Sequence, residues 1–369
     1  MSHLPRVGID AHVLDGKPQG SATFLLQILK AVAHTSTPFQ IVVFCENTDK
    51  IREMIGSSTF EYITIPATGS AARLLKSFPP ALRDHNIDLG VFQFIAPPLN
   101  RIPSLLVVHD LLPYSHPDLF PLGFRLSRQL LFRHSILRAH GIVTVSETAK
   151  KEITTRFPAL NVACTVASCS TSFTATQLFS TPIPPPPAPL LPGEPYILAV
   201  GRIEKRKNND LLVRAFLHAQ PQNVKLVIVG KQDMGYAWSP PSLESIIHLQ
   251  NLTNAELLAL FRNAALFVFP SQAEGFGIPL LDALLAGAAT ISSNQTAMPE
   301  VASGLALLFD PTLDQAEHAL ASLITAHFGD NPITAPTLEQ RRDLLAKFSW
   351  EKSAQAFISA LTTALQHPK

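Results

Sequence analysis

Short apolar runs alternate with longer helical patterns along almost the whole chain, and this alternation limits the folds that it can adopt. The apolar runs fall into two sets: Arg6–Asp10, Gln40–Phe44, Leu89–Phe92, Ser104–Val108 and Gly141–Val145, and then Tyr196–Val200, Lys225–Val229, Ile246–Leu249, Leu266–Phe269 and Ala289–Ser292. Strands this apolar are typical of a parallel sheet that helices cover on both faces. We therefore predict an α/β chain with two doubly wound, Rossmann-like domains.

A proline-rich stretch separates the two sets. Eight of the fifteen residues Thr181–Pro195 are proline. Proline has no amide hydrogen and a fixed φ, so this stretch is neither a central strand nor a helix interior. We predict an N-terminal domain over 1–180, a semi-rigid linker over 181–195 and a C-terminal domain over 196–347. Residues 348–369 are expected to form a helix that packs back on the N-terminal domain.

The composition argues against several classes of protein. Of the 369 residues, 46% are hydrophobic and 15% are charged, which allows a large core and argues against disorder. A formal net charge of +1 argues against nucleic-acid binding, which depends on excess positive charge. The three cysteines have no Cys-x-x-Cys spacing, which indicates reduced thiols rather than a disulfide or zinc framework.

The N-terminal segment MSHLPRVGIDAHVL lacks the basic start and apolar run of a signal peptide. No apolar stretch reaches the roughly 20 residues that span a bilayer. We expect a cytoplasmic protein that is soluble or attached only peripherally to the inner face of a membrane.

A basic loop follows the first strand of the predicted C-terminal domain. The strand Tyr196–Val200 is followed by Gly201, and then Arg202 and Lys207 precede a helix that begins near Asn208. Ligands of doubly wound folds bind at the carboxyl ends of strands, where cations beside a helix start suit a diphosphate. A solvated basic loop explains the same pattern, so these residues alone leave both interpretations open.

A second strand, loop and helix follow further along the chain. Pro279 falls in the first helical turn and Gly287 just past the helix, which are consistent start and stop signals. The loop Gly275–Gly277 lets the backbone approach a ligand, and amides at a helix start favour an anion. Glu274 lies in this loop and Asp282 one turn into the helix. Alternatively, Glu274 is solvated and Asp282 only complements the helix dipole.

Together, these stretches resemble glycosyltransferase family 4. The matching segments are VGRIEKRKN (Val200–Asn208), FVFPSQAEGFGIPLLDALLAG (Phe267–Gly287) and MPEVASGLALLFDP (Met298–Pro311). Weaker matches are VHDLLPYSHP (Val107–Pro117), TVSETAKKEI (Thr144–Ile153) and FSWEKSA (Phe348–Ala354). The resemblance covers nearly the whole chain, with the motifs in the expected order. It implies a retaining enzyme of the GT-B fold, in which two Rossmann-like domains face a cleft. The N-terminal domain is then expected to bind the acceptor, and the C-terminal domain to bind most of the nucleotide sugar.

The resemblance also implies roles for single residues. Arg202 and Lys207 match the pair that neutralises the donor diphosphate. Glu274 matches the first acid of the family's E-x7-E motif, which holds hydroxyls of the donor sugar. Asp282 occupies the position of the second acid, which binds the ribose. Backbone amides near the sugar and the diphosphate are expected from Gly275, Phe276 and Gly277.

Two departures from the family pattern bear on the site. Asp282 replaces the usual glutamate, so its side chain is one methylene shorter and its contact with ribose weakens or needs a water. The family often has a G-x-G loop before a helix in the first domain, whereas this chain has Gly20, Ser21 and Ala22 there. We keep these three residues as a candidate loop for donor or acceptor, because Ala22 is small enough for close approach.

His109 and Asp110 follow the strand Ser104–Val108. A side chain at the carboxyl end of such a strand would face the ligand cleft. The resemblance places His109 near the donor sugar, as a catalytic residue beside Glu274. The competing interpretation is a core histidine that Asp110 holds in place. We expect Asp110 to orient the ring or the loop.

No Asp-x-Asp pair occurs in the sequence. Metal-dependent transferases of the other main fold use such a pair to hold a divalent cation, whereas Arg202 and Lys207 could supply positive charge here. We therefore predict no metal and no cofactor, with a nucleotide diphosphate sugar as co-substrate.

The predicted reaction is transfer of a hexose to a saccharide or lipid-linked acceptor in surface polysaccharide synthesis. Mannose or glucose is suggested by the family's common use. Three alternatives stay open: a nucleotide-sugar epimerase of the GT-B type, a non-catalytic binding or scaffold protein, and a sugar phosphorylase. The departures at Asp282 and at Gly20–Ala22 motivate the scaffold alternative.

One predicted helix is rich in arginine. Phe124–His140 contains no acidic residue and has apolar residues interleaved with Arg125, Arg128, Arg133 and Arg138. Such a helix can lie on an anionic membrane, where each cation contributes about 1 kcal/mol. An ordinary helix that docks its apolar face into the first domain is the competing interpretation.

Overall fold

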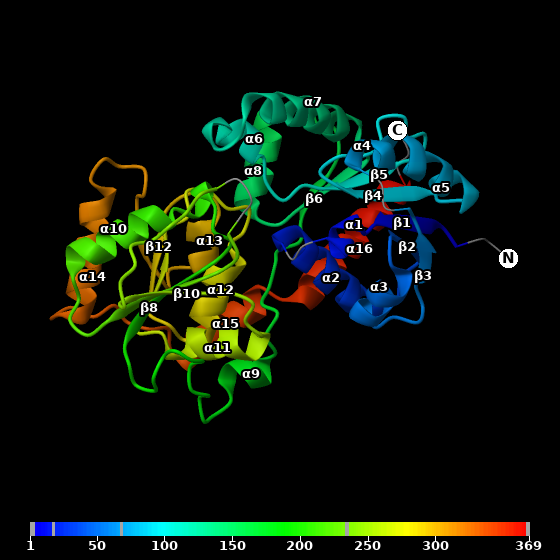
Figure 1. The fold of residues 1–369 in the computed structure, drawn as a ribbon. Coiled ribbons are helices and arrows are strands. Elements are labelled where there is room, and N and C mark those ends of the chain that lie inside the picture. The colour runs from blue at the N-terminus through cyan, green and yellow to red at the C-terminus, as the bar shows by residue number, and fades with distance from the viewer. Residues whose placement is uncertain (1–3, 17–18, 67–68, 233–235, 367–369) are drawn as a thin grey trace. The chain divides into compact units, whose positions relative to one another are not determined.

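The computed structural model describes residues 4–16, 19–66, 69–232 and 236–366 (Figure 1). By contacts between residues, the chain divides into two compact units. The first unit comprises residues 1–169 and 348–369, and the second comprises residues 170–347. The stretch 181–195 therefore belongs to the second unit, and the C-terminal helix to the first.

The first unit is built on a parallel sheet of seven strands in the order β3-β2-β1-β4-β5-β6-β7. The strands are β1 (Arg6–Asp10), β2 (Gln40–Cys45), β3 (Glu61–Thr64), β4 (Leu89–Gln93), β5 (Ser104–Val107), β6 (Gly141–Thr144) and β7 (Cys164–Val166). The chain starts in the middle, runs to one edge and returns to build the other half. The strand order reverses between β1 and β4, which is where open α/β sheets bind ligands.

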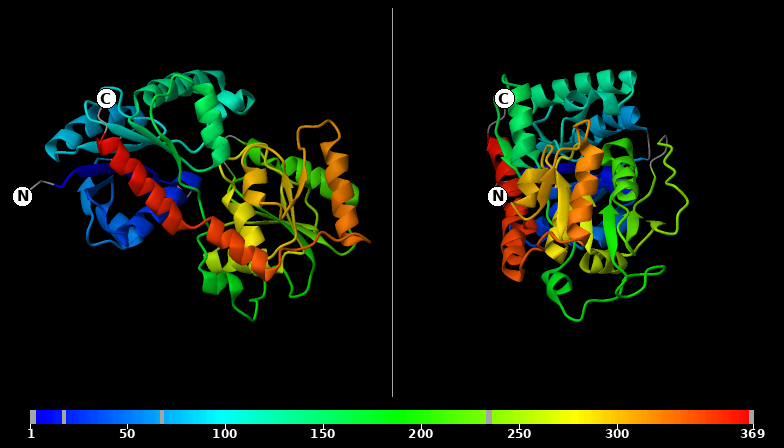
Figure 2. Two further views of the ribbon diagram at one scale, coloured as in Figure 1. Left: turned by 180° about the vertical axis from the view of Figure 1, so that it is seen from behind. Right: turned by 90° about the vertical axis from the view of Figure 1, so that its left-hand side faces the viewer.

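Helices cover both faces of this sheet. On one side, α16 (Trp350–Gln366), red in Figure 2, runs along β4–β7 and contacts α2 (Gly20–Ala33), which contacts α3 (Thr48–Ile55). A buried cluster joins the other side of the sheet to three helices, α5 (Phe78–Asp84), α7 (Leu122–Arg138) and α8 (Glu147–Arg156). The remaining elements are short: α1 (His12–Asp15), α4 (Ser70–Ala72), the π-helical turn η1 (Arg73–Ser77), α6 (Leu112–Ser115) and the 3-10 turn η2 (Pro117–Leu119).

The second unit repeats the plan with six parallel strands in the order β10-β9-β8-β11-β12-β13. They are β8 (Tyr196–Val200), β9 (Lys225–Val229), β10 (Ile246–Leu249), β11 (Leu266–Phe269), β12 (Thr290–Ser293) and β13 (Leu307–Phe309). Here the order reverses between β8 and β11. This is again the position that favours a ligand site.

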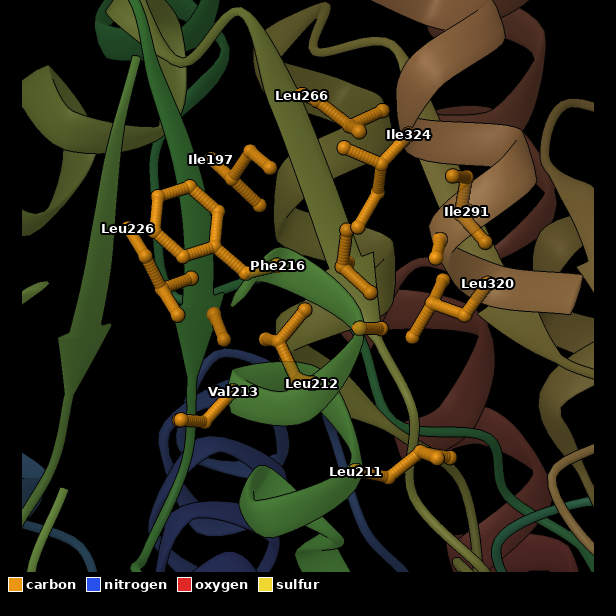
Figure 3. Packing of buried hydrophobic residues seen from close by; sticks show 14 of the residues in the cluster. Ile197, Leu211, Leu212, Val213, Phe216, Leu226, Leu266, Ile291, Leu320 and Ile324 are labelled. Carbon is orange, nitrogen blue, oxygen red and sulfur yellow. The ribbon is translucent and has the colours of Figure 1, made fainter. Parts of the chain in front are cut away.

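The core of the second unit lies between its sheet and two helices, α10 (Asn209–Ala219) and α14 (Ala316–Phe328). Figure 3 shows Leu212 and Phe216 of α10 and Ile324 of α14 packed against Ile197 and Leu266 of the sheet. Each of these side chains is at most 4% exposed, so the face is closed to water.

The opposite face of the second sheet carries helices that gather around α12 (Ile278–Ala286). These are α9 (Ala175–Phe179), α11 (Asn254–Asn263), α13 (Met298–Ala302) and α15 (Leu338–Lys347), and a 3-10 turn η3 (Lys205–Lys207) precedes α10. Because α12 contacts all four helices, its position is tightly fixed.

The predicted fold class of two doubly wound α/β domains is confirmed. All ten predicted strands are present, with ends that differ by one residue at most. Three short strands escaped prediction, β3, β7 and β13. They lie at sheet edges and are only partly buried, so they lack the unbroken apolar run of a central strand.

Candidate functional site

Two loops meet where the strand order of the second sheet reverses. One loop follows β8 and carries Arg202 and Lys207, and the other follows β11 and carries Glu274. Because β8 and β11 are parallel neighbours, both loops leave the same edge of the sheet. The fold therefore brings residues that lie far apart in the sequence to one position suited to a ligand.

Glu274 is the centre of an ion-pair cluster. One carboxylate oxygen lies 2.6 Å from Nζ of Lys207, and the other lies 2.6 Å from Nη1 of Arg206. Arg206 also pairs with Glu204 at 2.5 Å and donates to the carbonyl oxygen of Ala273 at 2.6 Å. These bonds fix the loop after β8 against the loop after β11.

The cluster keeps its members charged. Burial by itself would raise the pKa of Glu274, but the charges of Arg206 and Lys207 outweigh this effect and hold the pKa at about 2. Burial lowers the pKa of the Lys207 ammonium, and Glu274 offsets part of that effect. A carboxylate has about four lone-pair positions, so Glu274 can accept further hydrogen bonds from sugar hydroxyls.

Two residues of this cluster were not assigned a role from the sequence. Arg206 links the two loops through Glu274, and its place in the basic run with Lys207 was the available signal. Thr296 is the second: its hydroxyl accepts the backbone N–H of Glu274 at 2.9 Å. No sequence signal pointed to Thr296, because only the fold brings it to this loop.

The backbone of both loops depends on glycine. Gly201 follows β8 with φ +154°, and a Cβ there would lie 3.2 Å from the Lys207 side chain. Gly277 precedes α12 with φ +100°, a region that favours glycine. Phe276 is 3% exposed, so a ligand would meet the backbone of Gly275–Gly277 rather than the aromatic ring.

Asp282 lies in α12 and is 7% exposed. Burial raises the pKa of Asp282 to about 7, and a hydrogen bond with Thr171 opposes the rise only in part. Its Oδ1 has no hydrogen-bond partner among the described residues. A buried polar atom without a partner costs about 1–3 kcal/mol, which indicates an oxygen that a ligand or water completes.

In the first unit, His109 follows β5 and is 8% exposed. Its Nε2 lies 2.8 Å from Oε1 of Gln93, and its ring packs against Phe24 and Phe94 at centroid distances of 5.2 and 5.3 Å. Since a carbonyl oxygen only accepts, Nε2 carries the proton and Nδ1 is left as an acceptor. Burial lowers the pKa of His109 to about 4, so the ring is neutral at pH 7.

From the sequence, Asp110 was expected to orient either this ring or the loop that follows it. The structure shows Asp110 accepting the backbone N–H of Leu112 at 3.2 Å, at the start of α6. The ring nitrogen Nε2 of His109 donates its hydrogen bond to Oε1 of Gln93, a partner that sequence reasoning missed. Gln93 ends β4, the parallel neighbour of β5, and only the sheet order reveals that proximity.

The residues proposed as a candidate loop, Gly20, Ser21 and Ala22, form the first turn of α2. The interpretation as a loop is therefore wrong. Ser21 and Ala22 have no conformational reason to leave the helix, and the second glycine of the family pattern is missing. Ser21 still lines a cavity of the first unit, so a ligand role for this helix start stays a prediction.

Within the described residues, no three side chains of His, Cys, Asp or Glu are grouped as ligands for a metal ion. None of the described helices is both long and apolar enough to span a bilayer.

Residues 186–330 match the family model of the glycosyl transferases group 1. The matched range contains Arg202, Lys207, Glu274 and Asp282. The second unit carries a group 1 glycosyl transferase domain. The predicted resemblance is thereby confirmed at the level of group 1, and family 4 is compatible with it.

Relatives of this chain include two proteins from Escherichia coli. The serotype-specific mannosyltransferase WbdA is 34% identical over 193 residues, which cover 48% of this chain and 22% of WbdA. The O-antigen chain mannosyltransferase B is 28% identical over 283 residues, which cover 70% of this chain and 69% of that protein. The match therefore spans less than a quarter of WbdA.

Two solved structures show the same fold over nearly all of the chain. Sucrose-phosphate synthase from Thermosynechococcus elongatus has a TM-score of 0.74 at 18% identity, covering 98% of this chain and 99% of its own. HepE from Anabaena, in complex with UDP and glucose, has a TM-score of 0.70 at 15% identity. The match covers 97% of this chain and 100% of the HepE chain. These likenesses confirm the predicted GT-B fold class.

Proposed function

We propose that this chain is a retaining glycosyltransferase that moves a hexose from a nucleotide diphosphate sugar to a saccharide or lipid-linked acceptor in surface polysaccharide synthesis. Mannose is the favoured sugar, because the relatives WbdA and O-antigen chain mannosyltransferase B are named as mannosyltransferases. The observation that carries the proposal is the cluster of Glu274, Lys207 and Arg206 inside a group 1 glycosyl transferase domain.

The cluster suits the departure of a nucleoside diphosphate. Lys207 uses one N–H on Glu274 and has two left for phosphate oxygens, and Arg202 lies in the same loop. Positive groups fixed beforehand stabilise the negative charge that develops on the leaving diphosphate. Glu274, held ionised, accepts hydrogen bonds from the donor sugar, and Asp282 with its unsatisfied oxygen accepts from the ribose.

The chemical step needs no nucleophile from the protein. The bond between C1 of the sugar and the phosphate oxygen breaks, and the acceptor oxygen bonds to C1 from the same face. The acceptor proton passes to the departing phosphate oxygen. In this scheme the protein contributes position and charge.

The proposal includes a reaction without metal or cofactor, in which Arg202 and Lys207 supply the positive charge. Transfer should survive excess chelator at the rate seen without it. Loss of transfer that magnesium or manganese restores would overturn this part of the proposal.

The proposal also includes peripheral contact with an anionic membrane, through α7. Five large apolar side chains of α7 are exposed, namely Leu122, Phe124, Leu126, Leu130 and Leu131. Basic residues accompany them, and the helix contains no acid. Exposed apolar residues beside cations favour adsorption to the interface of anionic lipid.

Co-sedimentation with vesicles tests the membrane contact. The unaltered chain should bind vesicles of anionic lipid better than vesicles of neutral lipid, more strongly at low salt. Leu130→Ser with Arg133→Gln should remove the preference, whereas Leu313→Ser, at an exposed leucine of the second unit, should retain it. Equal sedimentation of the double variant and the unaltered chain would contradict the proposal.

Binding of nucleotide sugars tests the proposed function directly. We expect at least one nucleoside diphosphate mannose or glucose to raise the melting temperature, since a ligand at 100 times its dissociation constant adds about 2.7 kcal/mol. Turnover to an isomer of the same nucleotide sugar would favour the epimerase. Binding without turnover, across saccharide and lipid-linked acceptors, would favour the scaffold alternative.

A further inference from the structure

The first unit contains a cavity of about 610 Å³ beside the start of β5, a volume in the range of small-molecule sites. Ser104, the first residue of β5, lines this cavity, whereas His109 follows the other end of the strand. The remaining walls are the connection 97–103, which leads from β4 to β5, and the C-terminal part of α7. The cavity therefore lies at the sheet edge opposite to the one where doubly wound folds bind their substrates.

The lining of this cavity is positively charged. Arg101 comes from the connection, Arg138 ends α7, and His134 lies one turn before Arg138. Among the described residues that line the cavity, none is an aspartate or a glutamate. Neither arginine forms an ion pair with a carboxylate elsewhere in the described part of the chain. The two guanidinium charges are therefore not neutralised by the protein, and they suit an anion from solution.

The walls of the cavity are held in place by local hydrogen bonds. The side chain of Asn100 donates to the carbonyl oxygen of Ile102 at 3.0 Å and accepts the backbone N–H of Ile102 at 3.3 Å. Three of the seven residues 97–103 are proline, which fixes φ. On the other wall, Nδ1 of His140 accepts the backbone N–H of Ser104 at 3.3 Å, so Nε2 carries the proton of the neutral ring. A site with fixed walls loses less conformational entropy when a ligand binds.

The number of cations favours one class of anion. A phosphate monoester carries about two negative charges at pH 7 and has three terminal oxygens, so it can pair with both Arg101 and Arg138. A carboxylate carries one charge and would leave one guanidinium unpaired. The cavity is also large enough for the group that is esterified to the phosphate, and Pro98, Ile102 and Leu137 provide apolar surface for it.

An apolar strip of α7 leads to the cavity. Leu126, Leu130, His134 and Arg138 follow one another at a spacing of four residues, which places them on one face of the helix. Leu126 is 48% and Leu130 70% exposed. A lipid whose phosphate enters the cavity could therefore lay apolar chain along this face.

We propose that this cavity binds a phosphate monoester, with Arg101 and Arg138 on the phosphate oxygens and the esterified group against Ile102 and Leu137. Two kinds of ester share this chemistry: a soluble one, such as a sugar or glycerol phosphate, and the headgroup of a lipid such as phosphatidic acid. Binding of the ester does not depend on the proposed transfer of a hexose.

NMR of histidine rings in the full chain reports binding at the cavity itself. The probe is glycerol 3-phosphate, and the signals of His134 and His140 are assigned from His134→Gln and His140→Gln. We expect both signals to shift with one dissociation constant in the millimolar range. Arg101→Gln and Arg138→Gln should each raise this constant about tenfold, because each removes a charged hydrogen bond. Glycerate, the matching carboxylate, should bind about tenfold more weakly than the phosphate ester.

Arg133→Gln is the matched control, because Arg133 is exposed on the same helix, is absent from the cavity lining and carries the same charge. Its dissociation constant should equal that of the unaltered chain, and circular dichroism checks that all variants are folded. No shift at either histidine, equal binding of glycerate, or an unchanged constant in both cavity-arginine variants would overturn the proposal. An equal loss of binding in Arg133→Gln would overturn it as well.

Vesicles distinguish the two kinds of ester. Co-sedimentation compares phosphatidic acid, a monoester, with phosphatidylglycerol, a diester, at equal surface charge. If the ligand is a lipid headgroup, the chain should bind phosphatidic acid about fivefold more tightly, and Arg101→Gln with Arg138→Gln should remove the difference. Equal binding to both lipids, in a chain that binds glycerol 3-phosphate, would assign the cavity to soluble esters.

The same NMR signals separate this site from the proposed donor site. Arg202→Gln, in the second unit, should leave the shifts of His134 and His140 unchanged. A chain that binds glycerol 3-phosphate at the cavity but neither binds nor turns over nucleotide sugars would reject the proposed transferase and leave the phosphate site in place.

Discussion

Nζ of Lys207 lies 2.6 Å from Oε1 of Glu274, although 67 positions separate the two residues in the sequence. Their loops follow β8 and β11, the two strands between which the order of the second sheet reverses. Lys207, which is expected at the donor diphosphate, and Glu274, which is expected at the donor sugar, are thus held together by an ion pair. A change at one should disturb the other, and single substitutions here are not additive.

Removal of a cation from this edge should reduce transfer strongly. A charged hydrogen bond to phosphate contributes roughly 1.5–3 kcal/mol, so Arg202→Ala or Lys207→Ala should lower kcat/KM about tenfold to more than a hundredfold. Steady-state kinetics with circular dichroism as a check of folding measures this. Lys205→Ala, at an exposed residue of the same turn, should remain close to the unaltered enzyme. Near-normal activity in both the Arg202 and Lys207 variants would reject their role.

The two acids of the candidate site should differ in their effects. Glu274→Gln removes the charge that Lys207 and Arg206 share, at the position expected for the reacting sugar, so it should lower kcat more than Asp282→Asn does. Asp282→Asn should act mainly on donor affinity. The comparison needs kcat and the donor KM for both variants. A larger loss of kcat in Asp282→Asn would reverse the assignment.

Restoration of the family residue, Asp282→Glu, should preserve or improve donor affinity. The added methylene enters a helix whose neighbours are buried, so a lower melting temperature is expected as well. Donor titration followed by thermal shift reports both effects. Loss of donor binding in a folded variant would show that the family role does not transfer to this position.

Asp282 should make stability depend on pH. Its pKa is raised from 3.8 to about 7, so the unfolded chain releases this proton first and the buried carboxyl destabilises the fold increasingly from pH 3.8 to 7. Each pKa unit corresponds to about 1.4 kcal/mol. The free energy of unfolding of Asp282→Asn, measured relative to the parent chain, should therefore be higher at pH 8 than at pH 4 by on the order of 1–3 kcal/mol. Urea unfolding at both pH values measures the gain. A difference between variant and parent that stays constant with pH would contradict it.

His109 should have the opposite dependence. Its pKa is lowered from 6.5 to about 4, so its contribution is complete above pH 6.5 and is lost as pH falls towards 4, when only the unfolded chain takes up the proton. His109→Gln should therefore flatten the fall in stability over this range by up to about 1.4 kcal/mol per pH unit. His134→Gln, at an exposed histidine of α7, serves as the control. Parallel curves for His109→Gln and the parent would exclude this role.

The sequence was informative where a residue type carries its own local signal. Pro279 and Gly287 marked the ends of α12, and the left-handed conformation of Gly287 explains why that helix stops there. The apolar runs located every central strand to within one residue. The two-domain α/β fold and the sheet edge expected to bind ligands could thus be derived from the sequence.

Contacts that depend on the order of strands could not be derived. The bond between Gln93 and His109 exists because β4 and β5 are neighbours, and Asp110 looked the better partner only because it is adjacent in sequence. The same holds for Thr296 on the backbone of Glu274. The segment Gly20–Ala22 was expected to form a loop because the family often has a G-x-G loop at this position. In the structure these residues form the first turn of α2.

The most direct test of the central claim is an NMR time course of transfer from an α-linked nucleoside diphosphate mannose or glucose to a saccharide acceptor. We expect a new glycoside with the donor's α configuration, equimolar release of nucleoside diphosphate, and loss of both in Glu274→Gln. Formation of a β-linked glycoside would contradict retention. A folded chain that neither binds nor turns over any such donor would contradict the assignment as a glycosyltransferase.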